Sequence, residues 1–193
     1  MRTLLLLCLI SSIFNVLEID LEKVKKDMLD RHNLYRARHQ VGNLERNAAI
    51  EAIAQDYSEY LLSTGTFQHS FNKFNGEFLG ENLYLSTISI SLGIDPVDDW
   101  YAEVKNYNFD SPGYIPGTGH FSAVVWKKTK QLGCGVACSY EFYYCIVTCN
   151  YYPMGNNPEE FAENVFPLKD DTNAYSKPLY SYSLLFILIL LVL

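Results

Sequence analysis

Apolar side chains recur at helical spacing along two long stretches of this chain of 193 residues. Residues 21–40 predict a first helix, with Asp20 as its N-cap and Gly42 as the residue that stops it. A second helix is predicted to open at Asn47 and to end at Gly65. The positions that repeat on one face are Leu21, Val24, Met28, His32 and Tyr35 in the first helix and Ile50, Ile53, Ala54, Tyr57 and Leu61 in the second.

Two shorter helices and three strands complete the pattern. Asp95 is predicted to cap a third helix, with Pro96 at its first position, and this helix is expected to run to Tyr107. A fourth, short helix is predicted in GHFSAVVWKKT, residues 119–129, with Thr118 as its cap. Strands are expected at residues 81–86, 132–137 and 142–150. Helices on the outside of a small antiparallel sheet make this an α+β domain.

The first 15 residues have the order of a secretory signal peptide. A short positive start precedes an apolar run at residues 4–10, and the small pair Ser11 and Ser12 follows it. Seven apolar residues are too few to span a bilayer. The alternative is a buried N-terminal helix. We expect the segment 1–15 to direct the chain into the secretory pathway.

The other end of the chain stops in LLFILILLVL, residues 184–193. As a helix this run spans roughly 15 Å, about half of a hydrocarbon core. A stretch of small and polar residues precedes it, so residues 169–193 are interpreted as a GPI-attachment signal, with Asp171 and Asn173 as candidate attachment residues. The alternative is a short hydrophobic tail that oligomerises or inserts at an angle. An extracellular protein is expected, either secreted or GPI-anchored at the cell surface.

Removal of both ends leaves roughly 155 residues, the size of one domain with a real core, which we place at residues 18–168. The formal net charge of −7 argues against a nucleic acid partner.

Four of the five cysteines fall within 16 residues, at positions 134, 138, 145 and 149. Their spacing, without a nearby histidine, fits a zinc site poorly, and an oxidising compartment favours disulfides. The cysteines lie on two predicted strands of one hairpin, in which directly opposed residues have a constant index sum. The sum is the same for Cys134 with Cys149 and for Cys138 with Cys145. We therefore expect these two disulfides.

Five short motifs follow one another along the chain. They are HNLYRARH at 32–39, FQHS at 67–70, GENLY at 80–84, GHFSAVVWKKT at 119–129 and IVTCNYYPMGN at 146–156. The last two resemble the signature segments of the CAP superfamily, which comprises cysteine-rich secretory proteins, antigen 5 and pathogenesis-related proteins and shares the SCP domain. The other three match further segments of that family in the same order. One departure is Ala123, where the family usually carries Gln. The resemblance implies a three-layer α-β-α sandwich.

The resemblance also implies a cleft that gathers His69, Glu81, Glu103 and His120. In the family the two histidines can hold a divalent cation, often zinc, with the acids close by. Neutral imidazoles bind zinc well, and carboxylates can orient an imidazole N–H or hold a bound water. We therefore expect His69 and His120 to be ligands of Zn²⁺ or another divalent cation, with Glu81 and Glu103 as cleft acids. Two protein ligands plus waters make an open, weak site.

Each cleft residue also has a purely structural alternative. His69 and Glu81 could form a hydrogen-bonded pair that fixes the loop between them. Glu103 could be a solvated residue on a helix, and His120 could cap its own helix or satisfy a buried carbonyl.

The HNLYRARH motif contains two histidines and an asparagine outside the predicted cleft. His32 and Asn33 are expected to serve packing and hydrogen bonding, and His39 is expected to be exposed.

Three functions compete. The family resemblance favours a non-enzymatic binding domain for lipids, including sterols and fatty acids. In the loop FNKFNGEFLG at 71–80, Phe71, Phe74 and Phe78 could form an apolar lid for such a ligand, or serve as ordinary loop anchors.

The second function is a metal-dependent hydrolase or peptidase, with Glu81 or Glu103 as general base on a metal-bound water. Catalytic zinc usually has three protein ligands, and Ser70, the nearest nucleophile, adjoins His69 in the chain and is not expected to face it. The third function is an adhesive or structural surface domain that binds an unidentified extracellular protein.

Overall fold

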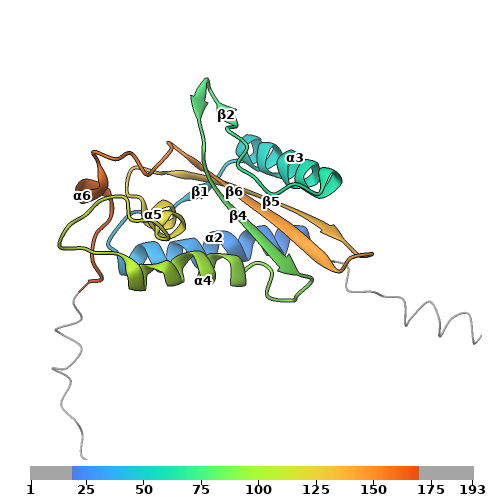
Figure 1. Ribbon diagram of the computed structural model, residues 1–193, viewed down its shortest axis with the longest axis horizontal. Coiled ribbons are helices and arrows are strands. Elements are labelled where there is room, and N and C mark those ends of the chain that lie inside the picture. Colours follow the sequence, from blue (N-terminus) through green and yellow to red (C-terminus); the bar gives the residue numbers. More distant parts are fainter. Residues whose placement is uncertain (1–18, 170–193) are drawn as a thin grey trace, which may run out of the picture.

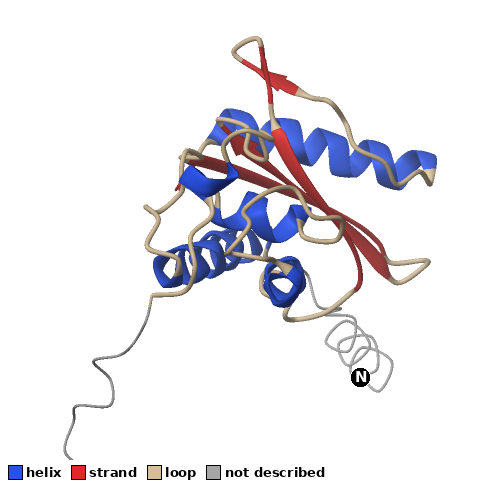
Figure 2. Cartoon of the chain, turned by 60° about the vertical axis from the view of Figure 1, so that its left-hand side comes forward, coloured by secondary structure: helices blue, strands red, loops and turns tan. Residues whose placement is uncertain are grey.

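The computed structural model describes residues 19–169, so the predicted signal peptide and nearly all of the predicted GPI-attachment segment lie outside the described residues. A four-stranded sheet in the order β1-β5-β6-β4 lies at the centre of the domain. Helix α3 (Ala48–Thr64) covers one face, and α2 (Leu21–Arg38), α4 (Asp95–Ala102) and α5 (Gly119–Val125) cover the other (Figures 1 and 2). The predicted α+β class and three-layer sandwich are confirmed. Within residues 19–169, no helix combines the length and the apolar character that crossing a membrane requires.

The strands divide into a main sheet and a separate hairpin. The main sheet contains β1 (Glu45–Arg46), β4 (Gly80–Thr87), β5 (Gln131–Ser139) and β6 (Tyr144–Tyr152), and the hairpin contains β2 (Lys73–Phe74) and β3 (Glu77–Phe78). β1 runs parallel to β5, and the other pairs are antiparallel. The sequence predicted β4, β5 and β6. It missed the other three strands because two residues are too few for an alternating pattern.

Both predicted disulfides are present between β5 and β6. Cys134 lies directly opposite Cys149, and Cys138 lies directly opposite Cys145. The next residue along β6 after Cys149 is Asn150, which lies opposite Glu81 of β4. The cross-linked hairpin therefore helps to position a residue that pairs with Glu81 of the predicted cleft.

Helix α3 lies unusually close to β5 because two residues of that strand lack side chains. A Cβ atom at Gly133 would lie 2.3 Å from the backbone nitrogen of Glu51, and one at Gly135 would lie 2.3 Å from that of Gln55. The Gln55 side chain then bonds both the N–H and the carbonyl of Val136. β1 pairs with β5 only at Gln131 and Leu132, so the Gln55 side chain supplies hydrogen-bond partners for backbone groups of β5 that β1 does not reach.

The predicted caps of the two long helices are largely confirmed. Asp20 accepts from the Lys23 amide, Asn47 accepts from the second and third amides of α3, and Gly65 ends α3 with φ of +64°. The prediction that Gly42 stops the first helix is wrong. α2 ends at Arg38, and Gln40 adopts the left-handed conformation with φ of +60°.

The third helix is shorter than predicted. α4 begins at Asp95, with Ile94 rather than Asp95 as its N-cap, and ends at Ala102. A 3-10 helix, η1 (Glu103–Asn106), follows, and Tyr107 is already extended. The Glu103 carboxylate bonds the start of α5, which ties the residue that follows α4 to another helix.

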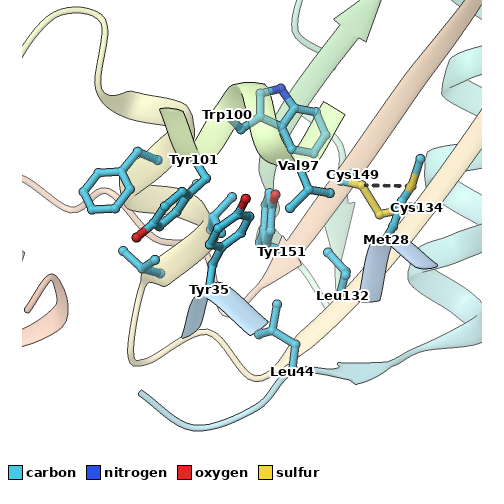
Figure 3. Close-up of a cluster of buried hydrophobic side chains, with 14 of the residues drawn as sticks. Met28, Tyr35, Leu44, Val97, Trp100, Tyr101, Leu132, Cys134, Cys149 and Tyr151 are labelled. Atoms are coloured by element: carbon cyan, nitrogen blue, oxygen red, sulfur yellow. Dashed lines mark hydrogen bonds between the residues drawn. A yellow bond between two sulfur atoms is a disulfide. The ribbon is translucent and has the colours of Figure 1, made fainter. Parts of the chain in front are cut away.

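The main core fills the space between the sheet and the layer of α2, α4 and α5 (Figure 3). His32 is buried in it, as expected for a packing residue, and Asn33 bonds the backbone of Leu44. The prediction that His39 is exposed is wrong. His39 is fully buried because Tyr101 and the segment that follows α6 (Phe161–Asn164), through the carbonyl of Phe166, pack over it.

Candidate functional site

The four predicted cleft residues line one cavity of about 280 Å³. They come from four segments: His69 from the loop after α3, Glu81 from β4, Glu103 from η1 and His120 from the first turn of α5. Asn82, Tyr114, Ala123 and Asn156 also line the cavity, and its lining contains no lysine or arginine. Two carboxylates without a counter-cation give the cavity an acidic character, which suits a cation better than an anion.

His69 and Glu81 form the first of two histidine–carboxylate pairs. His69 Nδ1 lies 2.8 Å from Glu81 Oε1. The Glu81 carboxylate is only 6% exposed and accepts from three further donors, which are the Ser70 amide at 2.9 Å, the Ser70 hydroxyl at 2.5 Å and Asn150 Nδ2 at 3.3 Å. A carboxylate only accepts, so His69 must carry its proton on Nδ1 to make this bond.

His120 and Glu103 form the second pair. His120 Nδ1 lies 2.7 Å from Glu103 Oε1, while the other oxygen of Glu103 accepts from the backbone amides of His120 at 3.0 Å and Phe121 at 3.1 Å. Thr118 is the N-cap residue of α5, as predicted. Its hydroxyl bonds the Ile115 carbonyl instead of capping the helix, so Glu103 supplies the acceptor for the first amides.

The two pairs leave the same atom available on each ring. Among residues 19–169, neither His69 Nε2 nor His120 Nε2 has a hydrogen-bond partner, whereas Nδ1 of each is engaged by a carboxylate. A neutral imidazole with Nδ1–H bound to a carboxylate presents Nε2 as a lone-pair donor, the arrangement seen around metal-bound histidines. In the part of the chain that the structure describes, no group of three or more His, Cys, Asp or Glu side chains is arranged to share a metal ion. The candidate ligands in the cavity are His69 and His120, and a cation held by them would need water to complete its coordination.

An apolar groove of about 360 Å³ adjoins the cavity. It is lined by Phe71, Phe78, Leu79 and Met154, and it shares His69 and Glu81 with the cavity. Phe71 is 79% exposed, so its ring is presented to solvent rather than packed. Phe74, the third residue of the predicted lid, instead packs edge-on against Tyr152 at 5.2 Å between ring centroids and serves as an anchor.

Sequence reasoning missed three residues that hold the His69 side of the cavity. Ser70 was considered only as a nucleophile, but its hydroxyl donates to Glu81. Asn150 reaches Glu81 because the two residues are directly opposed on β6 and β4. Tyr57 of α3 bonds the carbonyl of Gln68 at 2.6 Å, and burial, together with the Glu81 charge, raises the pKa of its hydroxyl. The role of Asn150 follows from the register of β4 against β6, which the sequence alone does not give.

Comparisons with known proteins agree with this architecture. A sequence profile of the cysteine-rich secretory protein family (CAP) matches residues 29–151. The human Golgi-associated plant pathogenesis-related protein 1 is 42% identical over 145 residues, which cover 74% of this chain and 92% of that protein. Pathogenesis-related protein 1 of Arabidopsis thaliana is 33% identical over 136 residues, or 70% of this chain and 80% of that protein.

Solved structures share the fold at lower identity. The crystal structure of NaASP2 with Zn²⁺ superimposes with a TM-score of 0.59 at 22% identity, covering 77% of this chain and 87% of that chain. The profile match spans more than half of the chain, and the human protein is similar over most of its length. The chain belongs to the cysteine-rich secretory protein family, the CAP family.

Proposed function

We propose that this protein is an extracellular, non-enzymatic binding domain in which His69 and His120 hold a divalent cation, with zinc as the first candidate. The observation that carries the proposal is the matched geometry of the two imidazoles. Each bonds a carboxylate through Nδ1, and each lines the same cavity with no partner for Nε2 among residues 19–169.

The chemistry of the cavity supports a cation. Two acids and no basic side chain surround the two rings. Zinc is well suited to imidazole nitrogen, and a bound cation would supply a positive centre with open positions for water or a ligand oxygen. The relative of the same fold described as NaASP2 with Zn²⁺ adds support for zinc.

The hydrogen bonding of the two acids favours binding over hydrolysis. Glu81 accepts from four donors and Glu103 from three. A general base needs an oxygen within reach of the water whose proton it takes. Here both carboxylates are engaged in orienting the histidines and the backbone around them, so neither is arranged as the base of a metal-dependent peptidase.

The apolar groove supports a lipid or sterol as the organic ligand. Exposed apolar side chains next to a polar cavity are typical of binding sites for molecules with an apolar body and a polar end. Phe71, Phe78 and Met154 would contact the apolar body, and the cavity would receive the polar end.

An extracellular location is supported by two cross-strand disulfides and by membership of a secretory protein family. We further propose GPI attachment near Asp171 or Asn173, which lie outside the described residues. Metabolic labelling of the anchor in cells, with an Asp171→Leu/Asn173→Leu variant as comparison, tests this part.

Isothermal titration of zinc into the disulfide-intact protein tests the proposed site. Saturable binding by the wild type, lost in His69→Ala/His120→Ala, is expected. Circular dichroism confirms that both proteins are folded. Failure of the folded wild type to bind zinc, or equal binding by the variant, would overturn the proposal.

Binding of a radiolabelled sterol and of a fatty acid tests the groove. Phe71→Ser should weaken binding, whereas Phe142→Ser should not, because Phe142 is a similarly exposed phenylalanine in the turn between β5 and β6, outside the groove. Equal binding by both variants would remove the groove as the ligand site.

A further inference from the structure

The two histidine–carboxylate pairs are held by different kinds of group. Glu103 is fixed by its histidine and by two backbone amides, which a substitution of side chains does not remove. Glu81 is fixed by its histidine, by one amide and by the side chains of Ser70 and Asn150. The orientation of His69 therefore depends on two side chains that do not line the cavity.

Asn150 donates a hydrogen bond to Glu81, but its own amide oxygen has no partner among residues 19–169. Its side chain is fully buried, and Nδ2 donates both to the Gly80 carbonyl at 3.1 Å and to Glu81 Oε2 at 3.3 Å. The amide oxygen Oδ1 is buried without a partner within residues 19–169. If the amide group were rotated by 180°, Oδ1 would face the Glu81 carboxylate, and two acceptors would then oppose each other. The amide therefore keeps its N–H donor toward Glu81, although this leaves Oδ1 without a partner.

Ser70 is held in one orientation by a second bond. Its hydroxyl oxygen accepts from the Asn72 amide at 3.0 Å while its proton is donated to Glu81 Oε2. The bond from Tyr57 to the carbonyl of Gln68 anchors the same loop to α3. The loop that carries His69 is thus bonded to α3 and β4, and through Glu81 to Asn150 of β6, although the His69 side chain itself is 55% exposed.

We propose that Ser70 and Asn150 are positioning residues of the His69 site. They fix the Glu81 carboxylate in one plane, so that His69 keeps its proton on Nδ1 and presents Nε2 to the cavity. The relevance of this positioning to metal rests on the proposed function. The positioning itself is a property of the metal-free protein and can be tested without any metal.

Long-range ¹H–¹⁵N correlation of the histidine rings, recorded at about pH 8, reports the tautomer of each ring. The wild type should show the Nδ1–H form at His69 and at His120. Ser70→Ala and Asn150→Ala should each produce a share of the Nε2–H form at His69 and leave His120 unchanged. Ser70→Thr, which keeps the hydroxyl, should restore the wild-type signals.

Ser58→Ala is the matched control, because it removes a buried hydroxyl that bonds Thr148 rather than Glu81.

Where the wild type binds zinc, both positioning variants should raise the dissociation constant for zinc about 10-fold or more. If Asn150→Ala fails to fold, Ser70→Ala alone decides. The inference is overturned if the folded variants retain the wild-type tautomer at His69, or if Ser58→Ala changes it equally. If the wild type binds no zinc, the proposed function is wrong. The tautomer measurement still tests whether Ser70 and Asn150 position His69.

Discussion

The four histidines of this chain form two groups, which differ in whether the ring nitrogen Nε2 has a hydrogen-bond partner. In the core, His32 Nδ1 bonds the Met28 carbonyl and Nε2 bonds the Tyr151 hydroxyl, and His39 likewise bonds the Phe166 carbonyl and the Tyr101 hydroxyl. In the cavity, His69 and His120 bond a carboxylate through Nδ1 and have no partner for Nε2 among the described residues.

This comparison separates a structural histidine from a candidate ligand. A buried imidazole must satisfy both nitrogens within the protein, because an unpaired polar atom in the core is destabilising. A ligand must leave one nitrogen available and have its other nitrogen held by an outer group. Burial and the state of Nε2, rather than the residue type or its motif, therefore distinguish the two groups.

The largest expected effect is on stability in the core group. His32→Ala leaves a void and removes the acceptor of the buried Tyr151 hydroxyl, so it should lower the free energy of unfolding by about 4 kcal/mol. His69→Ala, at a half-exposed site, should lower it by less than about 1 kcal/mol. Urea denaturation with the disulfides intact measures both. Equal losses in the two variants would contradict the distinction.

A second, smaller effect concerns pH. Burial lowers the pKa of His32 from 6.5 to about 4. The folded state therefore resists protonation of His32. The stabilisation that neutral His32 gives the folded state is fully present above pH 6.5 and is lost as the pH falls toward 4. From pH 7.5 to pH 5 the free energy of unfolding should fall by about 2 kcal/mol through His32. His39 should act in the same direction, since burial lowers its pKa as well.

Denaturation at several pH values with wild type and His32→Gln checks this effect. The variant is expected to be less stable at neutral pH and to show a shallower decline on acidification. A wild-type curve that is flat between pH 7.5 and pH 5 would mean that the buried histidines do not control acid stability.

The third effect concerns the cavity group alone. Glu81→Gln retains the shape of the side chain but places an amide against donors that need an acceptor. Loss of the carboxylate behind His69 should weaken zinc binding by about 10- to 100-fold. Calorimetry measures the affinity, with Glu163→Gln as the control because that glutamate is exposed and does not line the cavity. An unchanged affinity would show that the Glu81 carboxylate does not tune the site.

Local sequence signals predicted the main scaffold well. Asp20 and Asn47 cap the starts of their helices and Gly65 ends α3, through bonds or backbone conformations that depend on nearby residues alone. The register of the cysteine hairpin followed from the equal index sums of its two opposed cysteine pairs, Cys134 with Cys149 and Cys138 with Cys145. The four cleft residues were grouped through family resemblance, because no local motif joins residues from four separate segments.

Features that depend on distant contacts could not be predicted in this way. His39 is buried only because residues near the C-terminal end of the domain fold back over α2. Glu103 accepts from the first amides of α5 only because the fold brings η1 next to the start of that helix. Asn150 acquires a role only when β6 pairs with β4, which places it opposite Glu81.

The central claim is that the cavity histidines, and not the core histidines, offer Nε2 to a cation. Adding zinc to the disulfide-intact wild type while recording the ring nitrogens of all four histidines tests it most directly. We predict that Nε2 of His69 and His120 shifts while Nδ1 of each keeps its proton, and that His32 and His39 do not respond. Zinc binding that leaves both cavity Nε2 signals unchanged, or no response to zinc at any histidine, would contradict the account.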